Sequence, residues 1–130
     1  MKKKKLPSLK RLRNKLDFVF NTYIKLRDKK CILSGMTTNL HCSHYYDKKS
    51  NPFLRWDERN AHAMERKIHW MHHHGKAPDY ALWMFLNHNN IFMKLLSTDA
   101  GKKIKYKRED YVRLIITYEN KILLIKQPVL

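Results

Sequence analysis

The sequence contains no long apolar run. Its longest uninterrupted apolar stretch, YALWMFL at residues 80–86, is far shorter than the roughly 18 residues that a membrane-spanning helix needs. The lysine-rich start, MKKKK, is not followed by the apolar segment of about 7 to 15 residues that a secretion signal requires. We therefore expect a soluble cytoplasmic protein with no membrane partner.

Cysteine is scarce as well, since Cys31 and Cys42 are the only two in the sequence. Two cysteines are too few for a secreted fold that depends on disulfides, and they fit a reducing cytosol. A reducing compartment also disfavours the single bridge that these two residues are able to form.

Acidic residues are few compared with basic ones. The chain has 11 Asp and Glu against 28 Lys and Arg, a net charge of +17, yet 43% of its residues are hydrophobic. Such a composition is typical of a folded protein with a polyanionic partner, nucleic acid first and anionic membrane second. The length of 130 residues predicts a single domain, 8–130, after a basic flexible tail, 1–7.

The spacing of apolar residues predicts a mostly helical chain. Apolar residues three and four apart predict long helices over residues 8–28 and 107–125. The shorter predicted elements are an irregular hairpin over 29–60, helices over 61–75 and 78–87, a short apolar piece over 91–96 and a loop over 97–103. The tryptophans are expected in the core: Trp56, Trp70 and Trp83.

Seven of the eight histidines lie between positions 41 and 74. On a helix, His69 and His73 are one turn apart and share a face. His72 flanks that face and is a third candidate ligand, whereas His74 points elsewhere. Two imidazoles one turn apart form a clamp for a metal ion, although such a pair also occurs as a plain surface feature. His44, in the hairpin segment, has the chemistry of a general base near neutral pH.

Three segments together resemble the phage NinG/Rap recombination proteins, which are structure-specific DNA endonucleases of the HNH, or ββα-metal, superfamily. The segments are KLRDKKCILSG, SHYYDKKSNPFLRWDERNAHAM and the helix through His69 and His73. The resemblance extends over residues 17–80 and, more weakly, over the last helix. It implies an α+β, mostly helical fold. In that fold the N-terminal and C-terminal helices embrace a ββα core, a hairpin plus a helix, at about residues 31–75.

The resemblance also implies roles for individual residues. His44 falls on the general-base histidine of HNH enzymes and Asn60 on the middle asparagine. His69 and His73 fall on metal-ligand positions of the helix, and His62 matches the family's Asn-x-His step. The implied cofactor is one divalent metal ion. Phosphate chemistry and cellular abundance favour Mg²⁺ or Mn²⁺, whereas imidazole ligands favour Zn²⁺ or Ni²⁺.

Two features depart from the family's pattern. The family usually carries two C-x2-C knuckles that bind a structural zinc. Here the first is Cys31 to Ser34, and Glu65 and Ile68 occupy the second, so we do not expect a four-cysteine zinc site. Ser43 stands where the family has glycine and where many HNH enzymes have a ligand aspartate.

The implied function is metal-dependent endonucleolytic hydrolysis of DNA, with branched recombination intermediates as the expected substrates and the host cytoplasm as the place of action. Its alternative is a non-catalytic, DNA-binding recombination accessory protein with a degenerate HNH core. An RNA-binding or membrane-surface polycation explains the charge but leaves the histidines without a role.

Basic residues flank the implied site and are expected to bind the phosphates of branched or duplex DNA. Such contacts make binding dependent on salt and on DNA shape rather than on base sequence. The residues expected to make them are Lys3, Lys4, Lys10, Arg11, Arg13, Lys48, Lys49, Arg55, Lys102 and Lys103.

Overall fold

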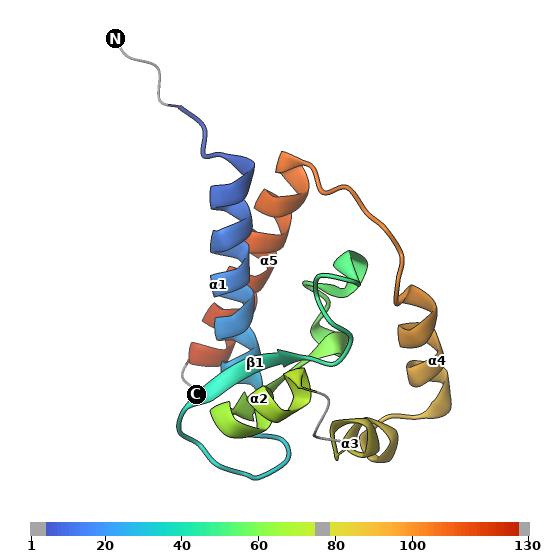
Figure 1. Cartoon of the computed structure of the whole chain (residues 1–130). Coiled ribbons are helices and arrows are strands. Elements are labelled where there is room, and N and C mark those ends of the chain that lie inside the picture. Colours follow the sequence, from blue (N-terminus) through green and yellow to red (C-terminus); the bar gives the residue numbers. More distant parts are fainter. Residues whose placement is uncertain (1–4, 75–78, 128–130) are drawn as a thin grey trace.

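The computed structural model describes residues 5–74 and 79–127 (Figure 1). In chain order the elements are α1 (Leu9–Asp28), β1 (Leu40–His44), the 3-10 helices η1 (Pro52–Leu54) and η2 (Glu58–Asn60), β2 (Ala61–Glu65), α2 (Arg66–His73), α3 (Asp79–Asn87), α4 (Asn90–Asp99) and α5 (Arg108–Lys126). Helices predominate and the sheet is one antiparallel pair, which confirms the predicted α+β, mostly helical fold.

The two long helices lie side by side, as Figure 1 shows. Helix α1 begins at Leu9 because the Ser8 side chain accepts a hydrogen bond from the Arg11 amide at 3.1 Å. It ends where Lys29 adopts a left-handed conformation with φ of 65°. Buried side chains of both helices form one cluster, among them Leu16, Phe20, Ile24, Tyr111, Ile115 and Tyr118. The predictions of helices over residues 8–28 and 107–125 are confirmed.

Strands β1 and β2 form a hairpin whose register runs from Leu40 opposite Glu65 to His44 opposite Ala61. Helix α2 follows β2 directly, so the three elements make a ββα unit. The prediction of a helix over 61–75 was wrong for residues 61–65, which are β2. Ala, Met and Glu favour helix locally, but the first four residues of this segment are buried and pair with β1. The long-range pairing overrides the local preference.

Helix α4 is longer than the sequence predicted. Asn89 begins it by accepting a hydrogen bond from the Phe92 amide at 2.8 Å. Residues 97–99 were predicted as loop but continue the helix. The hydroxyls of Ser97 and Thr98 both donate to the Lys94 carbonyl at 2.8 Å, which satisfies them without breaking the helix.

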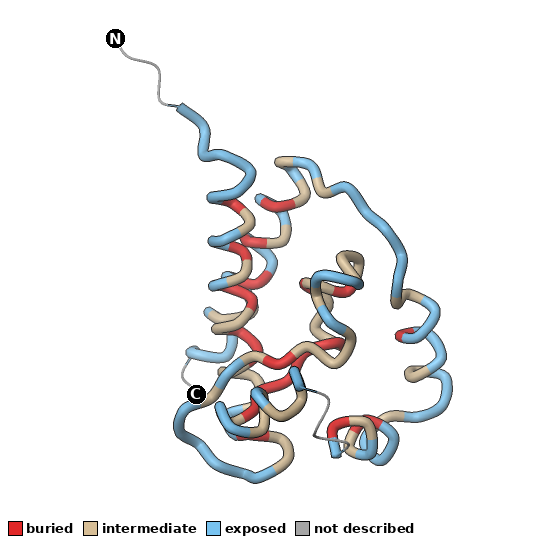
Figure 2. Tube along the Cα trace, viewed as in Figure 1, coloured by how far each residue is buried: buried red, intermediate tan, exposed pale blue. Residues whose placement is uncertain are grey.

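The core consists of two clusters, one on the α1 and α5 side and one beneath α3 and α4 (Figure 2). Trp56 belongs to the first and Trp83 packs against the second, as expected for core tryptophans. Trp70 is 53% exposed, so its placement in the core was wrong. The reason is that α2 buries none of its residues fully. No helix among the described residues is long and apolar enough to cross a membrane.

Candidate active site

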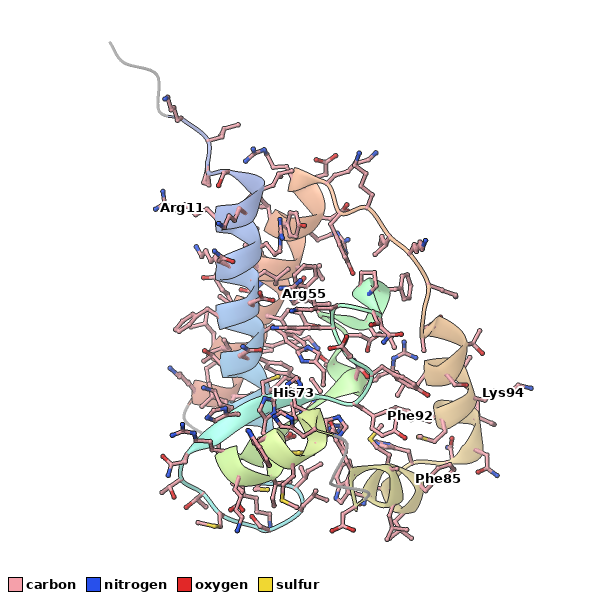
Figure 3. The ribbon with its side chains drawn as sticks, viewed as in Figure 1. Arg11, Arg55, His73, Phe85, Phe92 and Lys94 are labelled. Carbon is pink, nitrogen blue, oxygen red and sulfur yellow. The ribbon has the colours of Figure 1, made fainter. Side chains whose placement is uncertain are left out.

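A cavity of about 260 Å³ opens where β1, α2 and the loop after β1 meet α1. Its lining residues are Asn21, Cys42, His44, Tyr45, Asp47, Lys48, His69, His72 and His73. In Figure 3 the His73 side chain lies close to β1, between α2 and α1. The fold therefore brings the candidate base, His44, together with the candidate ligands of α2.

His44 lies at the end of β1 and is fixed through its ring. Its Nε2 atom lies 2.8 Å from the Arg55 carbonyl oxygen. Because a carbonyl oxygen only accepts, Nε2 carries the proton and Nδ1 keeps a free lone pair in the neutral ring. Burial lowers the pKa of His44 below its ordinary value of 6.5, so the ring is neutral at neutral pH. That is the tautomer and charge state that a general base needs.

Asn60 lies behind the cavity rather than in its wall, and it is completely buried. Its side-chain amide donates to the carbonyls of Tyr46 at 3.0 Å and Leu54 at 3.3 Å. Its side-chain oxygen accepts from the Tyr46 amide at 2.8 Å. These bonds close the loop between β1 and β2, and that loop carries the Arg55 carbonyl which orients His44. Asn60 thus holds the loop in place, and its predicted part in catalysis stays a prediction.

Arg55 and Trp56 are anchored to α1 by one carboxylate. Asp17 accepts from Arg55 Nη2 at 2.7 Å and from Trp56 Nε1 at 2.8 Å. The Tyr118 hydroxyl also bonds to the Trp56 carbonyl from α5. Both long helices therefore hold the segment that fixes His44. The structure gives the Arg55 guanidinium an internal partner, and its role as a DNA contact stays a prediction.

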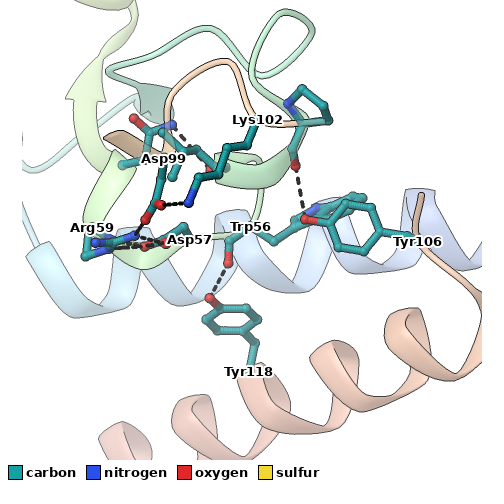
Figure 4. A network of polar contacts seen from close by, with 10 residues as sticks. Trp56, Asp57, Arg59, Asp99, Lys102, Tyr106 and Tyr118 are labelled. Atoms are coloured by element: carbon teal, nitrogen blue, oxygen red, sulfur yellow. Dashed lines mark hydrogen bonds and ion pairs between the residues drawn. The ribbon is translucent and has the colours of Figure 1, made fainter. Parts of the chain in front are cut away.

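A second set of contacts ties the same loop to the end of α4, as Figure 4 shows. Arg59 binds Asp57 at 2.7 Å and Asp99 at 2.9 Å, and Asp99 also accepts from Lys102 at 2.8 Å. The Tyr106 hydroxyl donates to the Pro52 carbonyl at 3.0 Å. The loop is thereby held on its outer side as well.

The histidines of α2 differ in whether their ring nitrogens are hydrogen-bonded. His72 donates from Nε2 to the His44 carbonyl at 3.1 Å and so tethers α2 to β1. The His69 and His73 rings lie 4.7 Å apart, nearly perpendicular. His69 Nδ1 is buried and has no hydrogen-bond partner among the residues that the structure describes. Burial, with the nearby His73 and His41, lowers the pKa of His69 to about 4, so its ring is neutral at neutral pH.

The imidazoles of His69 and His73 fit part of a metal donor set. Within residues 5–74 and 79–127, no group of three or more His, Cys, Asp or Glu side chains is arranged to hold a metal ion. A divalent ion at His69 and His73 would need oxygen ligands from water or from a phosphate to complete its shell. His72, with one nitrogen already bonded to β1, stays a prediction as a third ligand.

The positions of the family's zinc knuckles are occupied by hydrogen-bonded groups. Cys31 is buried and its sulfur accepts from the Ser34 amide at 3.4 Å. The Ser34 hydroxyl bonds to Glu65 across the two knuckle positions at 3.2 Å. Cys31 and Cys42 are both free thiols. Ser43, at the family's glycine position, is completely buried and does not line the cavity.

Arg27 and Asp28, in the segment KLRDKKCILSG, have a structural role that the sequence did not predict. Arg27 donates to the Ala61 carbonyl at 2.7 Å and to the Glu58 carbonyl at 2.8 Å. Asp28 accepts from the Ala63 amide at 2.8 Å. The end of α1 therefore holds β2 through backbone groups.

The candidate DNA contacts are spread over several elements. Lys48 lines the cavity, and Lys102 is paired with Asp99. The remaining ones described by the structure are exposed or half-buried: Lys10, Arg11, Arg13, Lys49 and Lys103. Figure 3 shows Arg11 pointing away from α1. Lys3 and Lys4 lie outside the described residues, as does Gly75, the predicted end of the second helix.

Similarity to known proteins identifies the family to which the chain belongs. Neither the curated proteins nor the solved structures give a match to the chain. A family model, described as the bacteriophage lambda NinG protein, matches residues 1–127. The match includes the ββα unit, the cavity and both long helices, and it confirms the resemblance to these phage recombination proteins. The chain belongs to the family of the bacteriophage lambda NinG protein.

Proposed function

We propose that the protein is a metal-dependent DNA endonuclease of the HNH type. The observation that carries this proposal is the state of His44. Its Nε2 proton is committed to the Arg55 carbonyl, its ring is neutral, and it shares a cavity with His69 and His73. A base beside two imidazoles that can bind a metal ion is an arrangement suited to hydrolysis of a phosphodiester.

In this mechanism His44 Nδ1 takes a proton from a water molecule, whose oxygen attacks phosphorus. The bond between phosphorus and the 3′ oxygen breaks and the leaving oxygen takes a proton from solvent water, so the products are a 5′ phosphate and a 3′ hydroxyl. Lys48, also in the cavity wall, binds phosphate by its charge. His69 and His73 would hold a divalent ion, Mg²⁺ or Mn²⁺ with Zn²⁺ or Ni²⁺ as alternatives, which would stabilise the negative charge that develops during hydrolysis.

DNA is the proposed substrate because the chain carries a net charge of +17 and belongs to a family of phage recombination proteins. Branched recombination intermediates are the proposed preferred form. The basic residues contact phosphates and not bases, so shape rather than sequence sets this preference.

The test is a cleavage assay on linear, nicked and four-way branched duplexes with Mg²⁺, Mn²⁺ or EDTA. His44→Ala is expected to lower cleavage by about 10³-fold, within the usual range for loss of a general base. His74→Ala serves as the matched control, since His74 is an exposed histidine at the end of α2. It is expected to cleave normally.

Two results would overturn the proposal. Undiminished cleavage by His44→Ala would remove His44 as the base. Absence of metal-dependent cleavage of every substrate, with DNA binding retained, would establish the alternative function of a non-catalytic recombination accessory protein.

A further inference from the structure

The two peptide groups that flank His44 are each held by a side chain from another element. The Tyr80 hydroxyl of α3 donates to the Ser43 carbonyl at 3.1 Å, in the peptide before His44. His72 of α2 donates to the His44 carbonyl at 3.1 Å, in the peptide after it. With the Arg55 carbonyl at its ring, His44 is therefore fixed at three points.

We propose that Tyr80, oriented by His62, is a positioning residue that sets the direction of the His44 imidazole. The inference rests on the proposed function, in which His44 is the base. It also extends the site beyond the ββα unit, because Tyr80 belongs to α3.

The protons in this chain of bonds are assigned by elimination. The Tyr80 hydroxyl has one hydrogen, and the Ser43 carbonyl only accepts, so that hydrogen points to Ser43. The Tyr80 oxygen then accepts from His62 Nδ1, which lies 2.8 Å away. His62 therefore carries its proton on Nδ1. Each donor has one acceptor, and the sequence of bonds runs in one direction from β2 through α3 to β1.

Burial makes the arrangement rigid. Tyr80 and Ser43 are fully buried and His62 is only 5% exposed. The Tyr80 ring is also packed between His72, at 4.9 Å, and Tyr45, at 5.1 Å. In such surroundings water does not replace a lost donor, so removal of the hydroxyl leaves the peptide before His44 held by the pairing of β1 with β2 alone. A displacement of about 1 Å at a reacting group lowers turnover by up to roughly 100-fold.

The experiment compares Tyr80→Phe with Thr117→Val. Both variants remove one hydroxyl that donates to a backbone carbonyl, at 3.1 Å and 2.8 Å, but the Thr117 bond ends on Arg113 within α5 and not next to His44. The first measurement is the ¹⁵N spectrum of the His44 imidazole in the protein without DNA. Wild type and Thr117→Val are expected to show a single Nε2-protonated tautomer, and Tyr80→Phe a mixture of tautomers.

The second measurement separates kcat from KM in the cleavage assay. Tyr80→Phe is expected to lower kcat about 10-fold with KM unchanged, since positioning acts on the chemical step. Thr117→Val is expected to leave both constants unchanged. An unaltered His44 spectrum in folded Tyr80→Phe would overturn the inference, whether or not the protein cleaves DNA. Absence of cleavage in wild type would instead overturn the proposed function alone.

If Tyr80→Phe fails to fold, His62→Leu serves as the test variant. It keeps the Tyr80 hydroxyl but removes the donor that orients it. The same mixture of His44 tautomers is expected, and an unaltered His44 spectrum would overturn the inference.

Discussion

The two sides of the cavity are built in opposite ways. On the strand side, formed by β1, β2 and the loop between them, His44 is hydrogen-bonded through its ring and through its carbonyl, and Asn60 behind it is fully buried. On the helix side, formed by α2, no residue is fully buried and His73 is exposed. The candidate base is fixed by hydrogen bonds, whereas the candidate ligands lie on a helix that is only partly covered.

The difference follows from the tasks proposed for each side. A general base must point at its water before reaction begins, so the fold has to supply its orientation. Metal ligands gain order from the ion that they bind, because binding free energy offsets the cost of fixing their side chains. Changes on the strand side should therefore impair turnover and stability, and changes on the helix side should impair metal affinity.

The largest expected difference between the two sides is whether added metal restores the cleavage activity of a variant. His69→Ala is expected to raise the Mn²⁺ concentration for half-maximal cleavage by roughly 100-fold, with activity restored at saturation. His44→Ala, whose cleavage rate is expected to be about 10³-fold lower than that of wild type, should show no such recovery, because added metal does not replace a base. Titration of cleavage rate against Mn²⁺ measures both. Recovery of His44→Ala at high metal would contradict the division between the two sides.

The next contrast is in stability. Asn60→Leu leaves the buried polar groups of Tyr46 and Leu54 without their partner, and it is expected to lower the free energy of unfolding by about 3 kcal/mol. His73→Leu, at an exposed position of α2, is expected to change it by less than about 0.5 kcal/mol. Urea unfolding of the two variants gives the comparison. Equal losses would show that the helix side is as rigid as the strand side.

A smaller effect is expected in the pH dependence of stability. Burial, together with the charge of Arg27, lowers the pKa of His62 on β2 to about 3. Below its ordinary value of 6.5 the unfolded chain binds a proton that the folded chain does not, so stability falls as pH decreases from 6.5 toward 3.

His62→Asn keeps a donor near Tyr80 but removes this titration, so its unfolding free energy should fall less steeply over the same range. Thermal unfolding at a series of pH values measures the slope. His74→Asn, changed at an exposed position of α2, should retain the wild-type slope. Identical slopes for His62→Asn and wild type would show that groups other than His62 cause the loss of stability at low pH.

The smallest effect concerns DNA affinity. Lys48→Ala removes one phosphate contact at the cavity and should reduce the slope of log affinity against log salt concentration by about 1. Lys121 is already paired with Glu58 at 2.9 Å, so Lys121→Ala should leave the slope unchanged. Fluorescence anisotropy over a salt series tests both. A larger effect of Lys121→Ala would assign DNA binding to α5 instead of the cavity.

Periodicity predicted the long helices well because their apolar stripes are continuous and long. It failed over residues 61–65, where a short Ala- and Met-containing segment has no strand signal of its own and takes its form from β1. It also placed Trp70 in the core, since spacing alone does not say how much of a helix the rest of the chain covers.

The sequence by itself determined the excess of positive charge, the two long helices and the one-turn spacing of His69 and His73, because these depend on composition or on neighbours along the chain. Through motifs it also determined the family. Only the tertiary structure decided which nitrogen of His44 is free, since that depends on the Arg55 carbonyl and on the loop closed by Asn60. Hydrogen bonds between distant segments form only when long-range packing brings those segments together, and no local pattern in the sequence encodes them.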